Sequence, residues 1–192
     1  GLGQVSASLN LLTFLAAKTS KIKLGTAVLT LPWHNPVLLA EQVATMDLLS
    51  NGRIQLGVGK GYRYNEFKGF KIDMNEANER FHESIDIMVK SWKNKEKWSY
   101  FGKFWSFEDI IVEPSCYQLP YPTLWMAAGN HEAIKNVAKK NANLLLDQFS
   151  PLNEVIKRVE LYKSELEKNN FNNDTFNRIA LARALYLSLI HI

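Results

Sequence analysis

Two glycine-containing turns carry the residue types that could bind a phosphate group. In the first turn, Lys60 lies between Gly59 and Gly61, close to Gly57 and directly after an apolar segment. In the second, Gly129-Asn130 follows another apolar segment just before an expected helix. Backbone N–H groups at a helix start attract anions, and Lys60 adds a positive charge. Each turn also has an ordinary structural interpretation, a tight turn with a solvent-facing lysine or an asparagine helix cap. Because both lie at the same end of an expected sheet, together they favour a phosphorylated cofactor.

The GxGxG pattern is not a complete nucleotide-binding fingerprint. A Rossmann fingerprint, GxGxxG, opens directly into a helix, whereas residues 62–73 are expected to form a polar loop. No Gly-Lys-Ser/Thr sequence of a Walker loop occurs. A Rossmann-type dehydrogenase is therefore disfavoured.

The other reactive side chains form no recognisable catalytic set. The histidines are unclustered: His34, His82, His131 and His191. No metal site is predicted, because the spacing of metal-binding motifs is missing. His34 follows a strand end, where it could face a site or be an ordinary loop histidine. Arg80 lies in the first turns of a helix and could bind an anion, although an ion pair with Glu76 or Glu83 is the simpler interpretation.

Apolar segments alternate with amphipathic helices along the chain. We expect strands at residues 22–31, 53–58, 123–128, 143–148 and 178–186, and helices at residues 8–18, 36–49, 76–92, 131–140 and from 151. This alternation predicts an α/β fold with a parallel sheet covered on its faces. Ligands of such folds bind at the carboxyl ends of the strands. The aromatic-rich residues 94–121 interrupt the alternation and are expected to form a short hairpin insertion that covers the outer surface or, alternatively, lines a ligand cavity.

Local signals set several helix boundaries. Asn35 is expected to cap a helix that begins at Pro36, and Asn51-Gly52 suits a left-handed ending. Ser8 and Ser150 are expected to cap two further helices. We also interpret Asp47 and Arg53 as a structural ion pair across a helix–strand turn.

The composition is that of an ordinary globular protein. The 192 residues are 46% hydrophobic and 22% charged, and 23 basic against 19 acidic residues give a net charge of +4. The basic residues form no stripe, so nucleic-acid binding is not expected. The single cysteine, Cys116, excludes a disulfide framework and fits a cytoplasmic location. No membrane-spanning segment or signal peptide is recognisable.

Both ends of the chain suggest that it is a piece of a longer protein. It begins at Gly1 without methionine and ends in LSLIHI, which resembles a translated sequencing adapter. We expect residues 187–192 to be read-through and residues 1–186 to be protein. The alternative for the last six residues is a natural strand end.

Longer sequence motifs resemble a known family. The segment GTAVLTLPWHNPVLLAEQVATMDLLSNGRIQLGVGKGY, followed by EF at Glu66-Phe67, NERFHE at residues 78–83 and later YPTLWMAAGN, closely resembles the bacterial luciferase-like flavin monooxygenases. The resemblance extends to about Tyr186. It implies a TIM (β/α)8 barrel, here lacking about two strands at the N-terminus and further elements at the C-terminus, and the family's active-site histidine would precede Gly1. An open barrel exposes sheet edges, so this piece alone is expected to fold poorly and to be inactive.

The resemblance also assigns roles to individual residues. Ala27-Val28 falls where the family often has a non-proline cis peptide under the flavin ring. Lys60 matches an arginine beside the flavin phosphate, and Gly129-Asn130 matches a turn whose amides bind that phosphate. Arg80 matches a second arginine of the family. Two positions depart from the family. Asn78 stands where many members carry arginine, and Gly59 stands where luciferase has a reactive cysteine. The last two departures put one phosphate contact in doubt and argue against a true luciferase.

The function implied is a monooxygenase that uses reduced FMN and O2 to oxygenate a small organic substrate. A flavin reductase would supply the reduced flavin, and the full-length protein is expected to be a homodimer. Two alternatives stay open, a deazaflavin-dependent dehydrogenase of the same fold and a non-catalytic flavin-binding barrel.

Overall fold

The computed structural model describes residues 7–172 and 174–183. The chain divides into two units, Gly1–Leu124 and Trp125–Ile192. The elements of the first unit are α1 (Ser8–Lys18), β1 (Leu24–Gly25), β2 (Leu29–Thr30), the 3-10 turn η1 (Leu31–Trp33), α2 (Pro36–Leu49), β3 (Ile54–Gly59), α3 (Tyr64–Phe70), the 3-10 turn η2 (Met74–Glu76), α4 (Ala77–Lys93), β4 (Trp98–Phe101) and β5 (Ser106–Ile110). Those that follow are β6 (Thr123–Ala127), which starts at the boundary, α5 (His131–Lys139), β7 (Asn143–Leu146), α6 (Leu152–Lys168) and β8 (Ile179–Leu181).

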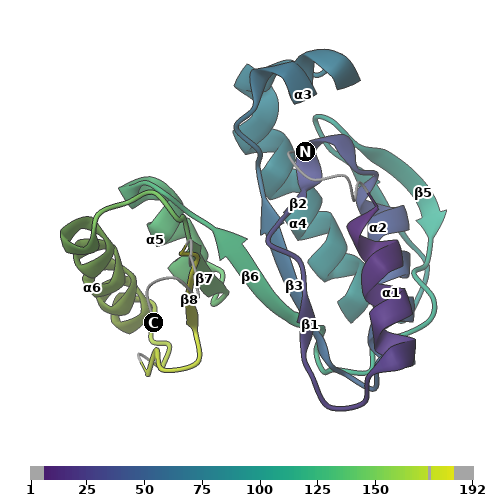
Figure 1. Cartoon of the computed structure of the whole chain (residues 1–192). Helices are drawn as coiled ribbons and strands as arrows, with labels where there is room; N and C mark the ends of the chain where they lie inside the picture. Colours follow the sequence, from purple (N-terminus) through teal and green to yellow (C-terminus); the bar gives the residue numbers. More distant parts are fainter. Residues whose placement is uncertain (1–6, 173, 184–192) are drawn as a thin grey trace, which may run out of the picture. The chain divides into compact units, whose positions relative to one another are not determined.

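The first unit is built on parallel strand pairs covered by helices (Figure 1). Strands β1 and β2 both pair in parallel with β3. Every residue of β3 except Gln55 is buried, as expected for a parallel strand covered on both faces. Helices α1 and α2 contact each other, and α1 contacts β1 while α2 contacts β3.

The second unit repeats this arrangement. Strands β6, β7 and β8 pair in parallel in that order, and α5 packs on both α6 and β7. Tyr162 of α6 is fully buried and donates a hydrogen bond from its hydroxyl to the carbonyl of Ala142, 2.6 Å away. The predicted parallel α/β organisation is thus present in both units.

The signals for α2 are confirmed, whereas two other cap predictions are wrong. The side chain of Asn35 accepts from the backbone N–H groups of Val37 and Leu38 at 3.0 and 3.2 Å. Asn51 and Gly52 have φ angles of 54° and 75°, the left-handed ending that their types favour. Ser8 is instead the first helical residue of α1. Ser150 precedes the N-cap of α6, and its hydroxyl hydrogen-bonds Asp147.

Three element predictions need correction. The strand expected at residues 22–31 is broken between β1 and β2. The polar loop expected at residues 62–73 contains α3, because Phe67 and Phe70 pack on Trp33 at ring-centroid distances of 5.1 and 5.2 Å. The last strand, expected at residues 178–186, is the shorter β8, since residues 182–183 are not strand. Residues 184–192, including the expected adapter segment, lie outside the described residues.

Asp47 and Arg53 do not pair with each other. The carboxylate of Asp47, fully buried, accepts from the backbone N–H and the side-chain amide of Gln118 at 2.8 and 2.7 Å. The Arg53 guanidinium donates instead to carbonyl groups at the end of α1 and beyond it, those of Ala16, Thr19 and Ile22. A buried charge needs hydrogen-bonding partners. The folded chain supplies them to Asp47 from Gln118, which is distant in sequence.

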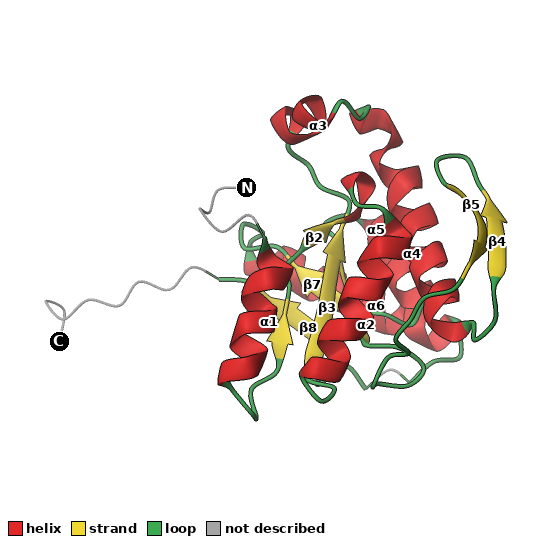
Figure 2. Ribbon diagram, turned by 90° about the vertical axis from the view of Figure 1, so that its right-hand side faces the viewer, coloured by secondary structure: helices red, strands yellow, loops and turns green. Residues whose placement is uncertain are grey.

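The hairpin of β4 and β5 covers helix α4. Figure 2 shows it on the side of α4 away from β3. Glu83 of α4 accepts from the backbone N–H groups of Phe104 and Trp105 in the hairpin turn, at 3.1 to 3.2 Å. The predicted hairpin is therefore confirmed, and it packs on helix α4. In the part of the chain that is described, no helix is long and apolar enough to cross a membrane.

Candidate functional site

A bulge separates β1 from β2. Leu24 pairs with Ile54, a difference of 30 in residue number, whereas Leu29 pairs with Val58, a difference of 29. Residues 26–28 therefore lie opposite only two residues of β3, Leu56 and Gly57. Such a bulge places backbone groups where a regular strand would not, and bulges are common beside active sites.

Thr26 and Gly57 join the two strands at this bulge. The Thr26 hydroxyl donates to the carbonyl of Gly57 at 2.7 Å and accepts from the Gly57 N–H at 3.1 Å. A Cβ atom on Gly57 would lie 1.8 Å from the Thr26 carbonyl oxygen. Glycine is thus required at residue 57 because the backbone of Thr26 fills the space of a side chain.

The expected cis peptide bond is present at Ala27-Val28. Ala27 is exposed, Val28 is half-buried, and Thr26 and Leu29 on either side are buried. Residues 27–28 are therefore held by buried neighbours at both ends, while Ala27 itself is open to solvent.

Lys60 lies one residue beyond the end of β3. Gly59 is buried and pairs with Thr30, the last residue of β2, so the two strands end side by side. Lys60 is exposed and makes no hydrogen bond or ion pair with the described residues. Its ammonium group is thus available for an anion at the carboxyl ends of these strands.

Arg80 is oriented by two neighbours. Its Nε and Nη2 atoms both contact the Glu76 carboxylate at 2.8 Å, and its guanidinium lies 4.3 Å from the centre of the Phe104 ring. The ion pair with Glu76 is thus present. A guanidinium has five N–H donors, so Arg80 has the capacity to serve a further acceptor besides Glu76.

The turn at Gly129-Asn130 belongs to the second unit. The Asn130 side chain caps α5 by accepting from the Ala133 N–H at 2.9 Å. Both turn residues are exposed, and nothing lies within 4 Å of the position of a Cβ on Gly129. The ordinary cap is present, and the open backbone beside it also leaves room for an anion at the first turn of α5.

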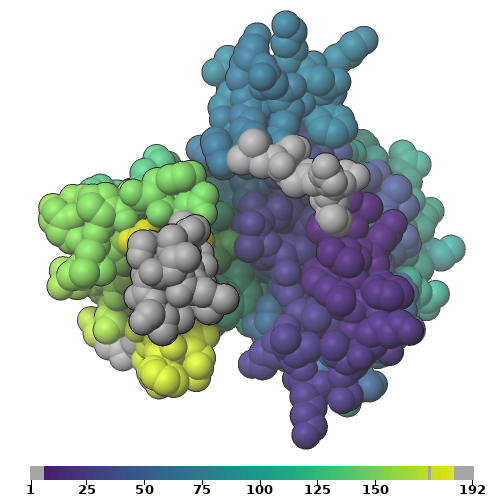
Figure 3. Space-filling view, viewed as in Figure 1, coloured from purple at the N-terminus to yellow at the C-terminus, as the bar shows by residue number. Residues whose placement is uncertain are grey.

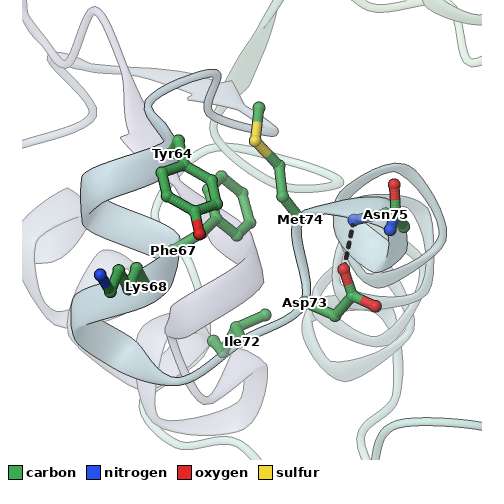
Figure 4. Close-up of a pocket in the computed structure, with 7 residues that line it drawn as sticks. All are labelled: Tyr64, Phe67, Lys68, Ile72, Asp73, Met74 and Asn75. Carbon is green, nitrogen blue, oxygen red and sulfur yellow. Dashed lines mark hydrogen bonds between the residues drawn. The ribbon is translucent and has the colours of Figure 1, made fainter.

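The α3 segment follows β3 and adds an apolar wall. Figure 3 shows this segment, in blue, projecting beyond the purple part of the first unit. A pocket of about 580 Å³ lies between α3 and η2. Its lining comprises Tyr64, Phe67, Lys68, Ile72, Asp73, Met74 and Asn75. In Figure 4, Tyr64 and Phe67 face Met74 across the opening, while Lys68 points away from Met74.

His34 follows η1 and is half-buried. Burial lowers the pKa of His34 below its usual value of 6.5. The imidazole is therefore mainly neutral at pH 7, and it can accept or donate a hydrogen bond without bringing charge to the strand ends.

Sequence reasoning missed Thr26 and the aromatic residues of α3. A glycine in the middle of an apolar strand, Gly57, was the available signal, since such a glycine often marks a close backbone approach. The Tyr-x-x-Phe-x-x-Phe spacing of Tyr64, Phe67 and Phe70 is the corresponding signal for a short amphipathic helix.

The fold and these strand-end features define a parallel α/β protein with a bulge and an exposed lysine at the carboxyl ends of its strands. The family model of luciferase-like monooxygenases matches residues 2–187. The chain therefore belongs to the luciferase-like monooxygenase family.

Individual relatives agree with this family. The chain is 29% identical over 180 residues to the oxygenase component of a flavin-dependent trigonelline monooxygenase from Acinetobacter baylyi, covering 91% of this chain and 48% of the relative. It is 31% identical over 128 residues to an FMNH2-dependent dimethylsulfone monooxygenase from Pseudomonas putida, covering 66% and 35%. The chain thus spans less than half the length of these relatives.

Solved structures share the fold. The monooxygenase RslO1 from Streptomyces bottropensis superimposes with a TM-score of 0.85 at 26% identity, covering 91% of this chain and 53% of the other. An F420-dependent secondary alcohol dehydrogenase superimposes with a TM-score of 0.79 at 14% identity, covering 93% and 54%. The second likeness is one of fold alone.

Proposed function

We propose that the chain is part of a flavin-dependent monooxygenase that uses reduced FMN and O2 to oxygenate a small organic substrate. One observation carries this proposal. The bulge at residues 26–28 leaves Ala27 exposed towards the carboxyl end of the strand pair, and the exposed Lys60 lies at the same end. Membership of a family of monooxygenases supplies the reaction class.

The residues present fit a flavin mononucleotide. The Ala27-Val28 peptide, exposed at Ala27, would support the ring, and Gly59, which has no side chain, would let the ring approach the end of β3. Lys60 would bind the phosphate as a point charge, without the bidentate fork of an arginine. Arg80, held by Glu76, would offer its remaining N–H donors. In the second unit, the open Gly129-Asn130 turn is by itself a candidate for binding a phosphate through its backbone amides.

When bound, reduced flavin supplies the electrons with which O2 is activated. The side chains of this chain would orient the reactants and exclude water. Phe67 and Trp33 close the apolar side of the α3 segment, and the neutral His34 avoids adding charge nearby. The pocket between α3 and η2 is our candidate for the organic substrate, because its volume suits a small molecule. Its lining combines apolar side chains, such as Phe67 and Met74, with polar ones, such as Asp73.

The partners proposed for the whole protein follow from the same assignment. A flavin reductase would supply reduced FMN, as the description of one relative as an oxygenase component suggests. The whole protein would be a cytoplasmic homodimer. It would need neither a metal nor a nucleic acid.

Titration of the full-length protein with reduced FMN under anaerobic conditions tests the proposal. We expect saturable binding, which Lys60→Gln weakens about tenfold because a charge-assisted contact to phosphate is lost. Lys23→Gln is the matched control, since Lys23 is also exposed but precedes β1 at the opposite strand ends. A folded protein that binds no reduced flavin would overturn the proposal.

Oxygen consumption then separates the alternatives. A monooxygenase consumes O2 in step with product formation. Activity with a reduced deazaflavin and no O2 uptake would instead identify the dehydrogenase. Flavin binding without any turnover across a panel of small organic substrates would favour the non-catalytic barrel.

A further inference from the structure

The hydroxyl of Thr26 replaces backbone hydrogen bonding where the bulge interrupts the strand pair. Thr26 is buried with 9% exposure, and Gly57 opposite it is buried as well. The Gly57 N–H and carbonyl both use Thr26 Oγ1 as their partner, at 3.1 and 2.7 Å. Buried backbone groups need such partners. The Thr26 side chain thus provides the two hydrogen bonds that a neighbouring backbone provides elsewhere in the sheet.

The Thr26 hydroxyl serves both groups of Gly57 at once. It donates one hydrogen bond and accepts another through the same oxygen atom. Valine has the same shape but neither capacity, and it would leave two buried backbone groups unsatisfied. Serine retains the hydroxyl. These two substitutions therefore separate the hydrogen bonds from the shape of the side chain.

Thr26 is also covalently joined to Ala27. A displacement of Thr26 away from β3 moves the exposed Ala27-Val28 peptide directly. Lys60 is attached to β3 on the other side of the hydrogen bonds, three residues beyond Gly57. The Thr26 hydroxyl thus links the backbone proposed to support the flavin ring to the strand that carries the proposed phosphate ligand.

We propose that Thr26 is a positioning residue for reduced flavin, holding the Ala27-Val28 peptide at its working distance from β3 through its two hydrogen bonds to Gly57. The inference rests on the proposed function, because it takes the flavin ring to lie on Ala27-Val28. It predicts that Thr26 contributes to binding of the flavin ring, whereas Lys60 contributes to binding of the flavin phosphate.

Comparing reduced FMN with reduced riboflavin, which has the ring but no phosphate, tests the inference in the full-length protein. We expect Thr26→Val to weaken both ligands by the same factor, about tenfold, with the binding stoichiometry unchanged. Thr26→Ser should bind both within about twofold of the wild type. Lys60→Gln should weaken FMN alone. Hydrogen exchange at the Gly57 amide should accelerate in Thr26→Val but not in Thr26→Ser.

Thr13→Val is the matched control for a structural effect. It also removes a threonine hydroxyl that bonds to a backbone carbonyl, that of Leu9, at 2.9 Å within α1. It should leave the affinities for both flavins unchanged. Should Thr26→Val not fold, Thr26→Ala removes the same hydroxyl with less steric demand and carries the same expectation.

The outcomes distinguish this inference from the proposed function. A wild-type protein that binds neither reduced flavin overturns the proposed function, and this inference with it. A wild type that binds both, with Thr26→Val binding them equally well, overturns the inference alone. Loss of FMN affinity with riboflavin affinity retained would also overturn it, since the effect would then come from the phosphate end.

Discussion

Replacing Gly57 with alanine should open the strand pair at the bulge. The new Cβ would lie 1.8 Å from the carbonyl oxygen of Thr26, 2.9 Å from its carbonyl carbon and 3.7 Å from the Cα of Ala27. Normal carbon–oxygen contacts are near 3.3 Å, so the strands must separate by roughly 1.5 Å. The obstructing atoms are backbone, and no side-chain rotation can relieve the overlap.

The cost has two parts. Overpacking of a buried site costs about 1–3 kcal/mol. The separation also stretches the two hydrogen bonds between Thr26 and Gly57, each worth about 1 kcal/mol. We therefore expect Gly57→Ala to lower the free energy of unfolding by about 3–5 kcal/mol, a large share of the ~5–15 kcal/mol of a typical domain.

Urea denaturation of the full-length protein, followed by circular dichroism, measures this loss. Gly69→Ala is the matched control, because Gly69 lies within α3 and has nothing within 4 Å of its Cβ position. That control should be neutral or stabilising by up to about 1 kcal/mol, since alanine favours helix over glycine. If Gly57→Ala changes stability by less than about 0.5 kcal/mol, the close approach at the bulge is not as the structure shows.

Three further predictions concern groups elsewhere in the fold. Tyr162→Phe should cost about 1–2 kcal/mol in urea denaturation, because the Ala142 carbonyl loses its hydrogen bond inside the core; an unchanged midpoint would contradict this. Burial raises the pKa of Asp147, but hydrogen bonds from the Ser150 hydroxyl, from backbone N–H groups and from Arg158 outweigh it and hold the pKa at about 2. Since the folded pKa is depressed, the stabilisation should be complete above about pH 4 and lost towards about pH 2, and Asp147→Asn should abolish that part of the pH dependence of unfolding. This pH-dependent stabilisation should be below about 1 kcal/mol, because the ion pair of Asp147 and Arg158 is partly exposed to solvent. Burial and then a nearby carboxylate raise the pKa of Cys116 to about 12, so iodoacetamide at pH 8 should alkylate the folded protein at least about a hundredfold more slowly than the urea-unfolded chain, and equal rates would refute the burial.

Elements whose signals are local were predictable from the sequence. Asn35 and Pro36 start α2 through contacts within one helical turn, and the apolar run of β3 reflects burial on both faces. The family resemblance likewise pointed to the cis peptide at Ala27-Val28. Contacts between distant residues were not predictable in the same way. Closeness in sequence predicts an ion pair between Asp47 and Arg53, whereas in the structure Asp47 accepts hydrogen bonds from Gln118.

The sequence by itself determined the alternation of strands and helices, the luciferase-like family and the glycine positions at the strand ends. It could do so because periodicity, caps and motifs are properties of neighbouring residues. Only the tertiary structure decided that residues 26–28 form a bulge, that Thr26 satisfies both backbone groups of Gly57, and that α3 forms by packing on Trp33. The physical reason is that each of these features depends on contacts between residues about thirty positions apart. Such contacts form only when the chain folds, through strand pairing at the bulge and through side-chain packing at α3.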